Sequence, residues 1–113
     1  MIAVYIASPY TKGDVAINVR ESILVADKLL ELGYLPFVPL FSHFWHFLSP
    51  KAYETWIAYD KSWVLKCDVV LRLPGESSGA DGEVQIAKDN GMLVFYSIEE
   101  LTNWRTPNVK KFS

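Results

Sequence analysis

Four short apolar segments, separated by longer helical patterns, constrain the fold of this chain more than any other feature. The first segment, at 2–7, is continuous and rich in β-branched residues, which is typical of a strand buried on both faces. Comparable segments follow at 34–40, 67–73 and 92–96. Because parallel strands need long crossover connections, the alternation predicts an α/β protein with a parallel sheet and helices on both faces.

The helix expected between the first two strands has clear signals at both ends. Asp14 can cap its start and Gly33 can end it. Its predicted apolar stripe, with spacings of three and four residues, consists of Val15, Val19, Ile23, Ala26 and Leu30. The pattern therefore predicts an amphipathic helix that packs one face on the sheet.

The remaining elements vary in clarity. The two prolines within 34–40 place the second strand near an edge of the sheet or shorten it. The aromatic stretch 41–50 fits neither a helical nor a strand pattern. Further helices are expected at 51–66, 79–90 and, as a short one, 97–101. In such sheets ligands bind beyond the carboxyl ends of the strands, so the loops that follow the first three strands are expected to carry the function.

Length and composition limit the class of protein. With 113 residues, half of them apolar, the chain is expected to form a single domain, 1–113. Thirteen acidic and eleven basic residues leave no positive surface for a nucleic acid polymer or an anionic membrane, and no apolar run approaches a membrane span. The start of the chain has no signal-peptide pattern, and the single cysteine, Cys67, suits a reducing compartment. We therefore expect a cytoplasmic protein.

Glu83 is placed where a helix is usually apolar. It lies three residues after Ala80 and four before Ala87, on their face of the helix and near its first turn. The helix N-terminus favours the ionised carboxylate, whereas burial disfavours it. Glu83 is therefore either a pocket-facing carboxylate or a residue that folds back to cap its own helix together with Ser77 or Ser78.

Asp60 shows the same conflict within an aromatic stripe formed by Trp56, Trp63 and Val64. An unpaired charge there is costly, unless Asp60 lies at the exposed margin of the stripe. Asp68, at the start of the third strand, is more consistent with a structural role. Two acids that flank one strand end suggest glycosidic chemistry, in which one carboxylate attacks the sugar and the other handles the proton of the leaving group.

Searches for other chemistry yield little. The segment PGESSGADG has neither the Gly-Lys-Ser/Thr of a P-loop nor the spacing of a dinucleotide fingerprint. His43 and His46 have no further His or Cys close by, and no serine sits in a nucleophile elbow. We therefore expect neither a cofactor nor a metal.

Several segments, taken in order, resemble the nucleoside 2-deoxyribosyltransferase superfamily, which includes the deoxynucleoside 5'-monophosphate N-glycosidases. The segments are VYIASPYT, then G-Y-x-P-F-V-P, W-x3-D-x6-C-D-V-V-L and S-S-G-A-D-G-E-x3-A-x3-G, and the resemblance covers roughly residues 3–97. It is closest to short bacterial and phage members. It implies a flavodoxin-like or Rossmann-like three-layer sandwich with a parallel sheet of four or five strands.

The resemblance also implies a retaining mechanism and its catalytic residues. Glu83 matches the nucleophile that attacks C1' of the sugar and forms a glycosyl ester. Water resolves this ester in hydrolases, and a second base resolves it in transferases. Asp60 matches the acid that protonates or orients the leaving base, and Tyr5 matches a tyrosine that positions the nucleophile.

The expected substrate-binding residues lie on the loops that follow the strands. Ser77 matches a serine that binds the 5'-phosphate in the phosphate-dependent members, whereas transferases of free nucleosides tend to have Asp there. Tyr10 either contacts the substrate or closes the pocket. The full set of expected substrate-binding residues is Ser8, Tyr10, Thr11, Lys12, His43, Trp45, Ser77, Ser78, Gly79 and Asp81. Phe44, Trp45 and the histidines could stack on a base, or form a plain lid or dimer surface.

The sequence leads to one expected activity and two alternatives. The expected activity is N-glycosidic cleavage of a (2'-deoxy)nucleoside 5'-monophosphate, with hydrolase and transferase both open. The alternatives are a nucleotide-sensing module without turnover and an enzyme that attacks another N-glycoside, such as NAD. A homodimer or higher homo-oligomer is expected, since the family completes its site with a residue from a neighbouring subunit, for which Asn103 and Asn108 are candidates.

Overall fold

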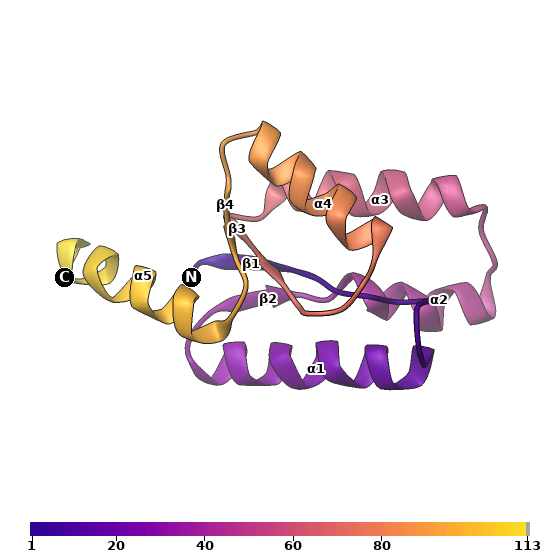
Figure 1. The fold of residues 1–113 in the computed structure, drawn as a ribbon, viewed down its shortest axis with the longest axis horizontal. Coiled ribbons are helices and arrows are strands. Elements are labelled where there is room, and N and C mark those ends of the chain that lie inside the picture. Colours follow the sequence, from indigo (N-terminus) through magenta and orange to yellow (C-terminus); the bar gives the residue numbers. More distant parts are fainter. Residues whose placement is uncertain (113) are drawn as a thin grey trace.

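The sheet of the computed structural model has four parallel strands in the order β2-β1-β3-β4 (Figure 1). The strands are β1 (Ala3–Ala7), β2 (Leu35–Phe37), β3 (Val69–Arg72) and β4 (Leu93–Phe95). The structure describes the backbone of residues 1–112 and the side chains of residues 1–105. The predicted α/β class with a parallel sheet is confirmed, and the proline-containing strand β2 lies at an edge, where a missing amide donor is tolerated.

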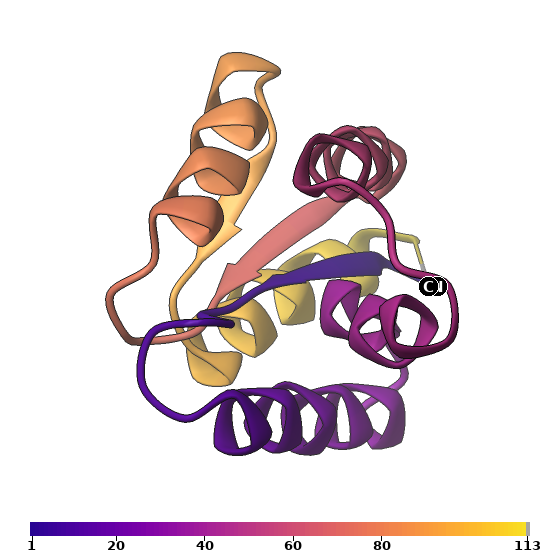
Figure 2. The same cartoon turned by 90° about the vertical axis from the view of Figure 1, so that its right-hand side faces the viewer.

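Helices cover both faces of this sheet and make it the middle of three layers. Figure 2 shows α1 on one side of the sheet and the pair α3 and α4 on the other. The helices are α1 (Val15–Glu31), α2 (Ser42–Leu48), α3 (Tyr53–Lys66), α4 (Ser78–Asp89) and α5 (Ile98–Phe112), with a 3-10 turn at Pro39–Phe41. This arrangement confirms the expected flavodoxin-like three-layer sandwich.

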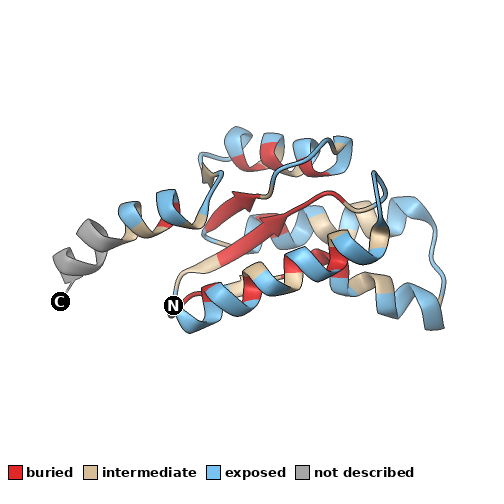
Figure 3. Cartoon of the chain, turned by 60° about the horizontal axis from the view of Figure 1, so that its bottom comes forward, coloured by how far each residue is buried: buried red, intermediate tan, exposed pale blue. Residues whose placement is uncertain are grey.

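Two apolar clusters, one on each face of the sheet, form the core. Alternate residues of β1 divide between them: Val4 and Ile6 pack towards α1 and α5, whereas Tyr5 and Ala7 pack towards α3 and α4. The central strands β1 and β3 are almost wholly buried (Figure 3). A polar group on the face that packs against α3 and α4, such as the hydroxyl of Tyr5, therefore lies in a layer from which water is largely excluded.

Three expectations about individual elements need correction. The predicted stripe of α1 ended at Leu30, which is 57% exposed, while Leu29 and Ser22 are buried instead. Leu29 lies three residues after Ala26 and seven after Ser22 and so continues their buried face, whereas Leu30, four after Ala26, lies at the margin of that face in the last turn of the helix. The short helix expected at 97–101 is the start of the 15-residue α5.

The third correction concerns the aromatic stretch 41–50, which fitted no pattern and contains the helix α2. Its sequence, SHFWHFL, has no apolar period because none of its residues is buried. Within the described part of the chain, no helix is long and apolar enough to cross a membrane.

Candidate active site

The centre of the candidate site is a hydrogen bond between Tyr5 of β1 and Glu83 of α4. The Tyr5 hydroxyl donates to Oε2 of Glu83. Tyr5 is fully buried, and Glu83 packs onto it from the helix layer beside Ala80 and Ala87. The odd position of Glu83 on an apolar helix face is thus explained, because the face meets a tyrosine hydroxyl within the core.

Burial dominates the acid–base properties of this pair. It raises the pKa of Glu83 to about 7, with the negative charge of Asp60 adding to the rise. The hydrogen bond from Tyr5 and the positive charge of Arg72 act in the opposite direction. Burial and the neighbouring Glu83 also raise the pKa of Tyr5, so the phenol stays neutral and remains a donor.

Asp60 supplies a second part-buried carboxyl to the same layer. It lies on α3, next to α4 (Figure 1), and its charge acts on both Tyr5 and Glu83. Burial raises the pKa of Asp60 to about 7, and its Oδ1 is buried without a hydrogen-bond partner among the described side chains. Because Asp60 and Glu83 both have a pKa of about 7, one of the two carboxyls can be protonated and act as an acid while the other is ionised.

Aromatic rings extend from Tyr5 across β2 to α3. The ring of Phe37 stacks on Tyr5 at 5.6 Å between centroids and on Trp63 at 4.4 Å. Trp63 contacts Tyr59 edge-on at 6.5 Å, and Tyr59 in turn contacts Trp45, one of the predicted binding residues, at 5.7 Å. Phe37 and Trp63 were missed in the sequence, where they resembled ordinary core residues.

Two loops meet at the carboxyl ends of β1 and β3. The Leu73 amide donates to the Ala7 carbonyl at 2.8 Å, and a side chain on Gly75 would approach Pro9 to 2.9 Å. Gly75 also has φ +117°, which only glycine adopts without strain. The two loops are thus packed closely where Gly75 meets Pro9.

The predicted binding residues of the first loop differ in their surroundings. Ser8 is 6% exposed, and its Oγ has no hydrogen-bond partner among the described residues. Thr11 is exposed, and Lys12 lies 3.9 Å from Glu76 of the second loop in a solvent-exposed pair. A buried unpartnered hydroxyl is a ready donor for a ligand, whereas Lys12 is held only weakly.

Ser77 caps α4, since its Oγ accepts a hydrogen bond from the Ala80 amide at 3.1 Å. The cap uses the hydroxyl only as an acceptor, so its proton remains available to a second group. Ser78 and Gly79 are exposed in the first turn. Capping and ligand binding by Ser77, the two readings of the sequence, are therefore compatible.

Tyr10, in the loop after β1, contacts His43 of α2. Tyr10 Oη lies 2.6 Å from His43 Nδ1, which joins the loop after β1 to α2. Asn18 holds that loop by donating to the carbonyls of Tyr10 and Lys12. Tyr10 is thus held by α2, as expected if it closes a pocket.

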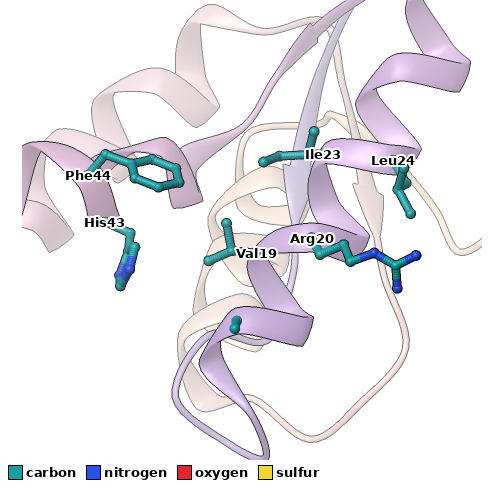
Figure 4. A pocket seen from close by; sticks show the side chains of 7 residues that line it. Val19, Arg20, Ile23, Leu24, His43 and Phe44 are labelled. Atoms are coloured by element: carbon teal, nitrogen blue, oxygen red, sulfur yellow. The ribbon is translucent and has the colours of Figure 1, made fainter.

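His43 also lines an apolar groove between α1 and α2, with a volume of about 340 Å³ (Figure 4). Val19 and Ile23 of α1 line one side of the groove, and His43 and Phe44 of α2 line the other. Tyr5, Asp60 and Glu83 do not line this groove. His43 is therefore assigned to the α1 side of the molecule, apart from the carboxyl pair.

Other candidates from the sequence have structural contacts or lie apart. Asp68 accepts a hydrogen bond from the Ala3 amide at 2.7 Å, which ties β3 to β1. Asn103 is exposed on α5, and Asn108 lies outside the residues whose side chains are described. Among the described residues, no group of three or more His, Cys, Asp or Glu side chains could hold a metal ion.

Arg72 is a charged residue of this region that the sequence patterns did not indicate. It is the last residue of β3 and is 8% exposed, and its guanidinium pairs with Asp81 of α4 at 3.0 Å. Asp81 was expected to bind substrate, whereas in the structure it contacts Arg72. The only signal in the sequence is a cation that directly follows the buried run Val69–Leu71.

Fold and site together define a flavodoxin-like α/β protein with a pair of part-buried carboxyls above its sheet. The chain belongs to the family described as "Domain of unknown function (DUF7768)", whose model matches residues 2–97. Among solved structures it is similar to the 2-deoxyribosyltransferase of the psychrotolerant bacterium Bacillus psychrosaccharolyticus. The TM-score is 0.60 at 17% identity, over 81% of this chain and 69% of that chain. No curated protein matches the chain. The resemblance found in the sequence is thus supported at the level of the fold.

Proposed function

We propose that this protein is an N-glycosidase that cleaves the base–sugar bond of a (2'-deoxy)nucleoside 5'-monophosphate through a glycosyl–Glu83 intermediate. The observation that carries the proposal is the group formed by buried Tyr5 and the part-buried Asp60 and Glu83, in which burial raises the pKa of both carboxyls to about 7. The similarity in fold to a 2-deoxyribosyltransferase supports the substrate class.

In the first step, a carboxylate oxygen of Glu83 bonds to C1' of the sugar as the base leaves with the electron pair of the glycosidic bond. Protonated Asp60 gives its proton to the departing base. In the second step, water attacks C1', the bond to Glu83 breaks to regenerate the carboxylate, and Asp60 accepts the proton. A second base in place of water gives deoxyribosyl transfer. Tyr5 holds Glu83 in place throughout, because its neutral hydroxyl is a hydrogen-bond donor to the carboxylate.

The aromatic rings beside this pair support recognition of a base. Phe37 and Trp63 form a stack that begins at Tyr5, and Trp63 is partly open to solvent. Flat heteroaromatic ligands gain stacking energy on such faces, and the gain depends little on which base is present. We therefore propose that the base lies towards β2 and α3.

A phosphate fits the opposite side of the pair, where the loops after β1 and β3 meet. Ser8 offers a buried hydroxyl without a partner among the described residues, Ser77 retains a hydroxyl proton, and the N-terminus of α4, which favours anions, begins at Ser78. Lys12 and Thr11 add donors at the exposed rim. These groups together support a 5'-monophosphate as substrate.

A substrate panel tests the proposal. The purified protein and its Glu83→Gln variant are incubated with dCMP, dGMP, thymidine and NAD, and free base is measured by chromatography. We expect base from the monophosphates and a loss of at least ~10³-fold in the variant, with Glu76→Gln as the exposed control. A second free base separates transferase from hydrolase. Release from NAD alone, or saturable nucleotide binding without any base release, would overturn the proposal in favour of the two alternatives.

A further inference from the structure

Arg72 is a buried cation whose contacts all lead to the loop and helix that carry Glu83. The guanidinium donates to the carbonyls of Leu73 and Gly75, the latter at 2.9 Å, and to Oδ1 of Asp81 at 3.0 Å. The first two contacts fix the path of the β3–α4 loop, and the third reaches the first turn of α4. Arg72 is only 8% exposed, and a buried charge is costly without such partners. The planar guanidinium is therefore held in one orientation by these three hydrogen bonds, which we call the Arg72 fork.

The register of the sheet places Arg72 on the same face as the Tyr5–Glu83 pair. Tyr5 pairs with Val70 and Ala7 pairs with Arg72 across β1 and β3. Since alternate strand residues share a face, Arg72 continues the row of Val70, which packs with Tyr5 under α4. Asp81, the ion-pair partner, precedes Glu83 by two residues on the same helix.

The charges around Glu83 come from every layer that packs against it. Tyr5 of β1 donates a hydrogen bond, Asp60 of α3 adds a negative charge, and Arg72 of β3 adds a positive one. Asp81 offsets part of this positive charge, but its side chain is 71% exposed and therefore well hydrated. Among the described groups found to act on Glu83, Arg72 is thus the permanent cation that offsets the burial of this carboxyl and the charge of Asp60.

We propose that Arg72 is a positioning residue for Glu83: its fork to the β3–α4 loop and to Asp81 sets the first turns of α4 above β1, and its fixed charge keeps the carboxylate available for attack. This inference rests on the proposed function, since it assigns Arg72 a part in that reaction. A merely structural arginine would fix the loop but leave the protonation of Glu83 unchanged.

Charge and geometry are separated by Arg72→Met, which removes both, and Arg72→Lys, which keeps the charge but cannot form the fork. The protonation of Glu83 is measured without substrate, by carbon-13 NMR of the glutamate side-chain carboxyls, with the Glu83→Gln variant used to assign the signal. The exposed Arg20→Met serves as a matched control on α1. The pH profiles of kcat and KM are measured on the same proteins.

In Arg72→Met we expect the pKa of Glu83 to rise by about one unit and kcat at pH 6.5 to fall ~10-fold with little change in KM. Arg72→Lys should keep the pKa and the acidic limb of the profile while kcat falls. Asp81→Asn removes the negative charge that partly neutralises the guanidinium, so it should lower the pKa of Glu83. If Arg72→Met does not fold, Asp81→Asn and Arg72→Lys together provide the test. The control should match the wild type.

The inference is overturned if the pKa of Glu83 is the same in Arg72→Met as in the wild type. It is also overturned if the pKa of Glu83 is unchanged in Asp81→Asn and kcat is unchanged in Arg72→Lys. The two proposals fail in different ways. Shifted titration without base release by any variant or the wild type refutes the proposed activity alone. Base release with an unshifted titration refutes only the role of Arg72.

Discussion

The hydroxyl of Tyr5, in the middle of β1, donates a hydrogen bond to Glu83, which α4 brings onto the same face of the sheet. The bond matters because burial and Asp60 both disfavour the charged form of Glu83. Among the described residues, only Tyr5 and Arg72 are found to lower the pKa of Glu83. A neutral phenol therefore helps to keep a buried carboxylate ionised near neutral pH.

Replacing Tyr5 by Phe should remove this bond and little else. We expect kcat to fall about 10- to 100-fold, the range for a hydrogen bond to a charged group, and the acidic limb of the pH profile to move to higher pH. Tyr34→Phe is a matched control, since Tyr34 is buried on the other face and its hydroxyl has no partner among the described residues. A Tyr5→Phe enzyme with an unshifted limb would contradict the role given to this hydroxyl.

Asp60 should determine the alkaline limb of the pH profile. The proposed first step needs Glu83 ionised and Asp60 protonated, and both have a pKa of about 7, so a narrow bell with its maximum near pH 7 is expected. The two limbs belong to the coupled pair and not to single residues. In Asp60→Asn the alkaline limb should vanish and kcat should fall ~10²- to 10⁴-fold.

The acidic limb of Asp60→Asn should also move to lower pH, because the variant lacks the charge that raises the pKa of Glu83. Initial rates between pH 5 and 9 test both effects, with the exposed Asp27→Asn as control. Persistence of the alkaline limb in Asp60→Asn would assign the acid to another group.

The positions of Glu83 and Asp60 were predictable because helix periodicity alone places each on an apolar stripe. Arg72 was not, since its partner Asp81 is nine residues away and the contact forms only once α4 folds back over β3. The helix α2 was missed for a different reason. With no buried residue it has no apolar period, so periodicity could not indicate it.

Ser77 is expected to contribute to both stability and substrate selection. Ser77→Ala removes the cap of α4 and should lower the unfolding free energy by about 1 kcal/mol. If the hydroxyl proton also reaches a 5'-phosphate, KM should rise for the monophosphate but not for the free nucleoside. Asp14→Ala is the matched control, because Asp14 caps α1 in the same way through the Ile17 amide. Equal KM changes for nucleotide and nucleoside would limit Ser77 to capping.

Glu83 should also leave a signature in the pH dependence of folding. Its pKa is raised from 4.5 to about 7, so between these values the folded protein binds more protons than the unfolded chain. The contribution of Glu83 to the unfolding free energy is then largest below pH 4.5 and is lost as pH rises through 7, by about 3 kcal/mol at most. Asp60, whose pKa is raised in the same way, adds to the slope.

Glu83→Gln removes the Glu83 part of this slope, because the amide is neutral at every pH. Relative to the wild type, the variant should gain stability between pH 4.5 and pH 8, while the exposed control Glu76→Gln should follow the wild type. Urea unfolding at pH 4.5, 6 and 8 measures the difference. A parallel pH dependence in Glu83→Gln and the wild type would mean that Glu83 is not desolvated in the folded protein, which would also remove the basis for its near-neutral pKa.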